Sequence, residues 1–228
     1  MPRTGKSTNG SFLLDFSHLK PKTQAHVRNV YMTMTGLMAA SVAGVYAYDI
    51  HRDDPSAVLI GSFVGALLCI ISVLASSNTP IRYISLVLFG IFKGVLVGPL
   101  IEHVDDAEMV IGALLASCTI FALLSASVLI SPNRKYVYLS GMLFSGIVIC
   151  FYGTILNVFF QSDAADTALI GIGLFVFAGY VLYDTQIMIE NASNEIYDVP
   201  TDVINLYTNL FAIFVRILRI MSKKKSKK

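Results

Sequence analysis

Long apolar runs alternate with short polar breaks along the whole chain. Six of the runs are as long as the roughly 20 residues that an α-helix needs to cross a bilayer. They are Val30–Tyr48, Ala57–Ser76, Ile81–Leu100, Met109–Ile130, Tyr136–Phe160 and Ala168–Ile189. The breaks between them are rich in Asp, Asn, Ser and Pro, which favour turns. The pattern predicts an all-α polytopic membrane protein that forms one helical bundle without a second domain.

A seventh run, Val203–Met221, has the length of a span but contains two Asn and two Arg. Such polar content makes it a weak span on any insertion scale. It either crosses the membrane as a seventh helix or enters and leaves on the same side as a re-entrant segment. The predicted plan is a cytosolic N-terminal arm at residues 1–26, a transmembrane bundle at 27–221 and a basic tail at 222–228.

Composition agrees with a membrane protein. The chain of 228 residues is 55% hydrophobic and only 14% charged, which excludes an ordinary soluble domain. Its three cysteines all lie inside apolar runs, without paired or metal-ligand spacing, and we expect them to be buried thiols. They are Cys69, Cys118 and Cys150.

Two pairs of glycines have the spacing that lets membrane helices approach closely. Gly61 and Gly65 form one pair, and Gly90 and Gly94 form the other. Small residues four apart lie on one helix face and allow close backbone contact. The alternative is that glycine is simply common in membrane helices.

The basic residues in the short connectors predict the orientation. Those of the arm and of the second and fourth connectors are Arg3, Lys6, Lys20, Lys22, Arg28, Arg82, Arg134 and Lys135. The positive-inside rule therefore places the N-terminus in the cytosol. Five lysines in Lys223–Lys228 conflict with this, because seven crossings put them on the far side. A re-entrant seventh segment keeps them cytosolic, and both topologies remain open.

Asp184 is the main candidate for function within the membrane. It stands in an otherwise apolar helix-length run, and a carboxylate in hydrocarbon is costly unless it has a partner. The alternative is that Asp184 lies near enough to the helix end to reach the headgroups, since Glu190 already marks that interface. In the seventh run, Asn205 and Asn209 are one helical turn apart and share a face.

Lys93 is a second charge inside an apolar run. From the helical rise it lies about 18 Å from the cytosolic end of its helix, and Asp184 about 9 Å from its own. A lysine stem spans much of that difference, and pairing lowers the cost of both charges. The alternatives are a Lys93 that faces an aqueous cavity alone or one that is neutral.

Known intramembrane chemistries do not fit the residues. An aspartyl protease needs a second aspartate in a Gly-x-Gly-Asp sequence, which does not occur. A serine protease needs a membrane histidine, yet all four histidines fall in predicted arms or connectors, and zinc ligands are not clustered. The histidines are His18, His26, His51 and His103. We therefore expect no enzymatic activity, no cofactor and no fixed metal.

An acidic group follows the third run, on the predicted lumenal side. It consists of Glu102, Asp105, Asp106 and Glu108. Such a group can concentrate Ca²⁺ through its field alone. The alternative is an ordinary solvated loop.

Four segments carry a resemblance to a known family. FSHLKPKTQAHVRNVY, GVLVGPLIE, LNVFF and GYVLYDTQIMIE, together with the lysine-rich tail, are similar to the Bax inhibitor-1 family over about Phe12–Lys228. The resemblance implies a seven-helix bundle in the endoplasmic-reticulum membrane that leaks calcium and suppresses stress-induced cell death. It implies Ca²⁺ as the permeant ion, Bcl-2-type proteins as partners and the bilayer as surroundings, with no nucleic acid.

The family's chemistry rests on two aspartates that share a proton and gate the pore with pH. The first matches Asp184, but the second falls on Asn209, which hydrogen-bonds without titrating. The proton-sharing pair is thus absent in its usual form, and pH gating is not carried over. Asp202, Glu190 and Glu102 are the candidates for a secondary carboxylate.

Two functional hypotheses follow. In the first, the protein is a cation leak pathway regulated by opening at Asp184, with Asn209 and Lys93 near the gate. In the second, it is a non-conducting membrane adaptor in which Asp184 and Asn209 form only an interhelical hydrogen-bond clasp.

Overall fold

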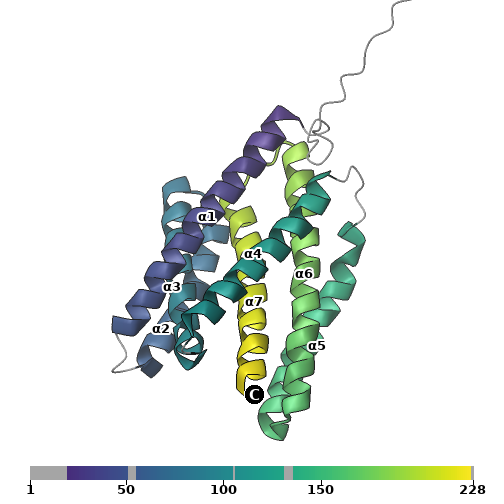
Figure 1. Ribbon diagram of the computed structural model, residues 1–228. Coiled ribbons are helices and arrows are strands. Elements are labelled where there is room, and N and C mark those ends of the chain that lie inside the picture. The colour runs from purple at the N-terminus through teal and green to yellow at the C-terminus, as the bar shows by residue number, and fades with distance from the viewer. Residues whose placement is uncertain (1–19, 51–54, 105, 131–135, 227–228) are drawn as a thin grey trace, which may run out of the picture.

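The described part of the chain folds into seven long helices (Figure 1). The computed structural model describes residues 20–50, 55–104, 106–130 and 136–226. The helices are α1 Pro21–Ile50, α2 Pro55–Ala75, α3 Thr79–Val104, α4 Ala107–Ile130, α5 Ser140–Phe160, α6 Asp163–Ser193 and α7 Val199–Ser226, with a short 3₁₀ turn, η1, at Tyr136–Leu139. No strand occurs within these ranges. Each helix is long and apolar enough to cross a membrane, so the predicted all-α polytopic class is confirmed.

The helix ends follow local sequence signals. Proline occupies the first position of α1 and α2, where its missing N–H costs nothing. Ser162 caps α6 by accepting a hydrogen bond from the Ala165 N–H at 3.3 Å. Because α1 begins at Pro21, its first turns belong to the segment that the sequence assigned to the arm.

The seventh segment is one continuous helix. α7 runs for 28 residues through the middle of the bundle (Figure 1), and contacts α1, α2, α3, α4 and α6. Its side chains Val203, Leu206, Ile213 and Leu218 are fully buried. A re-entrant segment must turn back within the membrane, so the unbroken α7 fits the seven-crossing alternative.

α1 and α3 cross at glycines. A Cβ on Gly94 would overlap the carbonyl oxygen of Ser41, and one on Gly90 would overlap Leu37. The Gly90–Gly94 pair therefore does what its spacing predicts. The second pair differs, since Gly65 faces Phe92 but Gly61 has open space around it.

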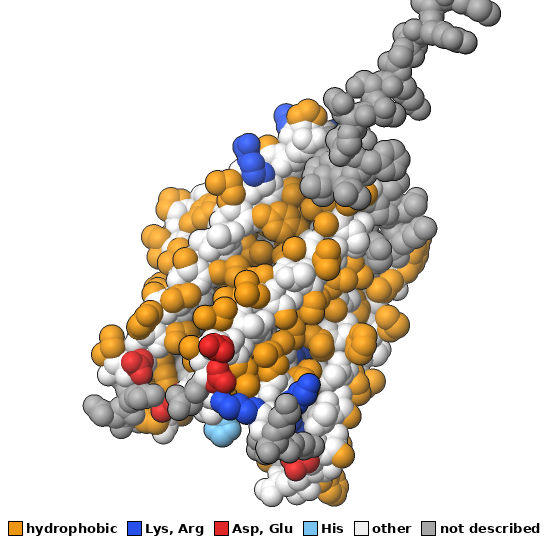
Figure 2. All heavy atoms as spheres, in the orientation of Figure 1, with side chains coloured by type: hydrophobic (Ala, Val, Ile, Leu, Met, Phe, Trp, Pro, Cys, Tyr) orange, Lys and Arg blue, Asp and Glu red, His pale blue; other side chains and the backbone are white. Residues whose placement is uncertain are grey.

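Charged side chains gather at the two ends of the bundle, and an apolar belt lies between them (Figure 2). We call the end where α1 and α7 begin the His26 end, and the end where α7 stops the Lys223 end. Large exposed hydrophobic side chains cover the belt, including Phe63, Leu68 and Phe175. In a protein with seven apolar helices this surface faces lipid.

Candidate functional site

Asp184 is bonded to Asn209. The Asn209 amide Nδ2 donates a hydrogen bond of 2.6 Å to Asp184 Oδ2, which joins α6 to α7. Asn209 is only 5% exposed, so the contact lies inside the bundle. The sequence predicted a partner for Asp184, and Asn209 fills that role.

A cavity of 370 Å³ adjoins this contact on the side of α2 and α5. Its polar wall consists of Tyr180, Asp184, Asn205, Thr208 and Asn209, and the rest is apolar. Asn205 and Asn209 thus share a face as predicted. The cavity offers hydrogen-bonding groups but only one carboxylate.

Lys93 does not pair with Asp184, and that hypothesis was wrong. Its Nζ lies 4.9 Å from the ring centre of Phe211 and 5.6 Å from that of Phe89. Within the described residues, no carboxylate lies within ion-pair distance of Lys93. The estimate of depth was not enough, because depth along a helix does not say which way a side chain points around it.

The secondary carboxylates lie elsewhere. Asp202 Oδ2 is 2.7 Å from His26 Nε2, Glu102 accepts a 3.1 Å hydrogen bond from the Tyr48 hydroxyl, and Glu190 lies near the C-terminal end of α6. No hydrogen bond joins any of them to Asp184 in the part of the chain that is described.

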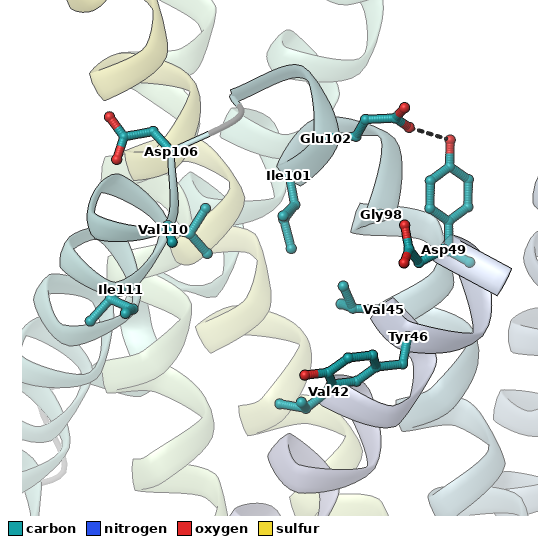
Figure 3. A pocket seen from close by; sticks show the side chains of 12 residues that line it. Val42, Val45, Tyr46, Asp49, Gly98, Ile101, Glu102, Asp106, Val110 and Ile111 are labelled. Atoms are coloured by element: carbon teal, nitrogen blue, oxygen red, sulfur yellow. Dashed lines mark hydrogen bonds between the residues drawn. The ribbon is translucent and has the colours of Figure 1, made fainter. Parts of the chain in front are cut away.

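A larger cavity opens at the Lys223 end between α1, α3 and α4 (Figure 3). It has a volume of 790 Å³, and Asp49, Glu102 and Asp106 surround it. Glu102 and Asp106 belong to the acidic group predicted from the sequence, whereas Asp49, at the end of α1, was not among the candidate residues. Of the remaining members, Glu108 does not line the cavity and Asp105 lies outside the described residues.

The described residues contain no cluster of three or more His, Cys, Asp or Glu side chains that could hold a metal ion. Asp49, Glu102 and Asp106 line the cavity (Figure 3), and carboxylates around a concave surface can attract cations through their field.

Two lysines in the last turn of α7 contact acidic residues at the same end. Lys223 Nζ lies 2.5 Å from Asp166 Oδ2, and Lys225 Nζ lies 3.0 Å from Asp106 Oδ2. The Lys225 hydrogen bond, together with one from the Met109 N–H, lowers the pKa of Asp106 below its ordinary value. Lys223 and Lys225 therefore end beside carboxylates, which the connector charges alone did not indicate.

A buried polar layer ties the helices together at the His26 end. His26 of α1 is 4% exposed and Asp202 of α7 is 8% exposed, and the His26 ring also contacts Tyr197. The sequence pattern predicted that His26 belongs to the N-terminal arm, yet it lies within α1. Its partner is 176 residues away in sequence, so no local signal could have revealed the pair.

Arg82 completes this layer. Its Nη2 contacts both oxygens of Asp198 at 2.7 and 2.8 Å and the Thr201 hydroxyl at 2.9 Å, while its Nε donates to the Val73 carbonyl. Burial by itself raises the pKa of Asp198, but the hydrogen bonds from Arg82 and Thr201 outweigh it and lower the pKa below 3.8. Arg82 thus anchors α2 and α3 to the start of α7.

Comparison with known proteins places the chain among relatives of similar length. A sequence model of the family described as "Inhibitor of apoptosis-promoting Bax1" matches residues 23–226. The chain is 31% identical to Bax inhibitor 1 of Rattus norvegicus and 30% identical to that of Homo sapiens, in both cases over 98% of each chain. It is 30% identical to Bax inhibitor 1 of Oryza sativa subsp. japonica, over 95% of this chain and 87% of the relative.

Proposed function

Because this chain belongs to the Bax inhibitor-1 family, we propose that it suppresses stress-induced cell death from the endoplasmic-reticulum membrane and leaks calcium across it. The N-terminus and the His26 end lie in the cytosol, following the basic connectors. The Lys223 end, with its acidic cavity, then faces the lumen where calcium is stored.

The observation that supports the leak is the acidic cavity. Asp49, Glu102 and Asp106 line it, and carboxylates around a concave surface raise the local cation concentration. A second cavity of 270 Å³ shares Val42, Val45, Ile101 and Val110 with it and reaches Tyr207 near the middle of α7. Calcium would collect at the acidic mouth and move inward along the path formed by the two cavities, which we call the seam.

Apolar side chains close the seam in the described conformation. Phe211 and Phe214 line the inner cavity, and the Tyr207 hydroxyl is hydrogen-bonded to Ser41 of α1. Opening therefore requires α1 or α4 to move relative to α7. Asp184 lies on the other side of α7, so its bond to Asn209 regulates the pathway by holding α6 against α7 rather than by lining the seam.

Calcium efflux from liposomes tests the proposal. The purified protein is reconstituted with a calcium dye, and the double variant Asp49→Asn/Glu102→Gln is compared with wild type. We expect wild-type flux above empty liposomes and a reduction of about threefold or more in the variant, because two of the three lining carboxylates are neutralised and Lys225 pairs with the third. Glu108→Gln is the matched control, since Glu108 is exposed at the same end but does not line the cavity.

The adaptor function is the second candidate. Its support is the hydrogen bond from Asn209 to Asp184, which gives the carboxylate a partner within the bundle. In this case the protein acts by binding Bcl-2-type membrane proteins. Wild-type liposomes that release calcium no faster than empty ones would contradict the leak and leave the adaptor function.

A further inference from the structure

Arg216 is a cation of α7 inside the membrane region. Arg216, Arg219 and Lys223 follow one another along α7 beside α6. Lys223 lies 2.5 Å from Asp166, and Arg219 lies 4.0 Å from the same residue. No acidic side chain among the described residues is within ion-pair distance of Arg216.

The guanidinium is held in place with most of its donors unused. Its Cζ lies 4.3 Å from the ring centre of Phe177, and Nη1 donates one hydrogen bond of 3.1 Å to the Ala212 carbonyl of its own helix. A guanidinium has five N–H donors, and no other hydrogen bond of Arg216 is found in the described residues. Gly173 of α6 provides the space, because a Cβ there would overlap Arg216 Nε.

Arg216 lines a mostly apolar groove. It lines a cavity of 310 Å³ with Ile147, Phe151 and Ile155 of α5 and with Phe177 of α6. Ile147 and Phe177 also wall the cavity beside Asp184, so the two cavities adjoin along the face of α6 and α7. The groove is open at the lipid-facing surface and has a fixed positive charge at the Arg216 end.

We propose that this groove binds a long-chain fatty acid from the bilayer. The carboxylate takes the free edge of the Arg216 guanidinium, and the alkyl chain lies along Ile147 and Phe177 toward the second cavity. A guanidinium matches a carboxylate through two parallel hydrogen bonds, and an unpaired charge in hydrocarbon is costly. The bound carboxylate pairs with the Arg216 guanidinium and so lowers the free-energy cost of its charge in the membrane.

The depth of Arg216 favours a fatty acid over a phospholipid. Arg216 is two helical turns from Lys223, so it lies about 10 Å further into the membrane than the tail. A carboxylate is small enough to be drawn to that depth. A phosphodiester would have to bring its glycerol and headgroup below the interface with it.

Photolabelling tests the site in the full-length protein. The protein in lipid nanodiscs is exposed to a 16-carbon fatty acid that carries a diazirine on its chain, and labelled peptides are mapped by mass spectrometry. We expect labels on α5 and α6 around Ile147 and Phe177, competition by unlabelled palmitate, and none by palmitic acid methyl ester. Arg216→Gln should lower the labelling at least about tenfold, as loss of a charge-assisted pair predicts.

Two further variants separate the site from general effects. Gly173→Ala displaces the guanidinium, a flexible side-chain end, and should lower labelling while Arg216 remains present. Arg219→Gln removes a charge one turn away that is half-exposed and near Asp166, and should leave labelling unchanged. Equal labelling of wild type and Arg216→Gln, or equal competition by the methyl ester, would overturn the proposal. So would competition by phosphatidic acid but not by palmitate, which would show a phospholipid site.

Discussion

The contact between Asp184 and Asn209 shows how one asparagine changes the chemistry expected of a pair of aspartates. Asn209 has nearly the shape of aspartate and stands 2.6 Å from the carboxylate, but it donates a hydrogen bond where aspartate would bring a second charge. The helices stay joined without a shared proton. The pair therefore lacks the second carboxyl group that a shared proton requires.

Asn209→Asp should introduce pH dependence. Two carboxylates at hydrogen-bond distance do not both ionise readily, so the variant must exchange a proton as its contact forms and breaks. We expect calcium flux in liposomes to change little between about pH 6 and 8 in wild type and several-fold in the variant. Asn205→Asp is the control, because Asn205 lines the same cavity without bonding to Asp184. A steep response in wild type would point to Asp202 or Glu190 as the second carboxylate.

Lys93 should be energetically independent of Asp184. Its amine lies over Phe89 and Phe211, so the relevant measurement is a double-mutant cycle of Lys93→Met and Asp184→Asn on the free energy of unfolding. We expect coupling within about 0.5 kcal/mol of zero. The cycle of Lys93→Met with Phe211→Leu should give about 0.5–1 kcal/mol or more. Coupling of about 2 kcal/mol between Lys93 and Asp184 would restore the ion pair.

At the scale of the helices, glycines allow the backbones of α1 and α3 to come into direct contact where the two helices cross. The backbone of Gly94 meets that of α1 near Ser41 and Gly44, and no larger residue fits there. This contact positions α1 so that its far end borders the acidic cavity.

Gly94→Ala should therefore destabilise the protein. The new methyl group overlaps backbone rather than a movable side chain, so the helices must separate, at a cost of about 1–3 kcal/mol or more. Gly61→Ala is the matched control, since it adds the same group to a membrane helix where space is open. Thermal unfolding in detergent measures both, and equal melting temperatures for the two variants would contradict the close crossing.

The Arg82–Asp198 bond should stabilise the start of α7 in a pH-dependent way. The pKa of Asp198 is lowered in the folded protein, so its contribution is present above the ordinary value of 3.8 and is lost as the pH falls through the folded value. Because Asp198 is 38% exposed, solvent screening keeps the effect small. Arg82→Gln should lower the melting temperature by about 2–4 °C at neutral pH, and this difference should shrink below about pH 4. Lys22→Gln, at an exposed position of α1, should show no such convergence.

Sequence alone predicted the helices well but not their polar contacts. The apolar runs located all seven helices, because crossing a bilayer imposes a length and composition that each segment must satisfy by itself. Hydrogen-bond partners are different. His26 and Asp202 meet only after α1 packs beside α7. The side chain of Lys93 points to Phe211 because packing sets the rotation of α3 about its axis. Asp49 and Arg216 were missed as site residues for the same reason.

At the scale of the whole molecule, acidic side chains lie at the end of the bundle where the basic end of α7 stops. α1 begins at one end of the bundle and α7 stops at the other. At that second end, Asp166 and Asp106 receive Lys223 and Lys225. The tail is thus matched to acidic neighbours, although the positive-inside rule by itself would put it with the arm.

The topology that follows can be tested with glycosylation. With seven crossings and a cytosolic N-terminus, an acceptor Asn on a flexible extension after Lys228 should be glycosylated, because α7 ends at the lumenal side. The natural Asn191-Ala192-Ser193 should stay unmodified, since it lies in the last turn of α6 at the His26 end. An acceptor inserted into the connector at residues 51–54 is the positive control, as it precedes α2 on the tail side. A modified connector with an unmodified tail would require a re-entrant seventh segment, and a glycan at Asn191 would reverse the orientation of the whole bundle.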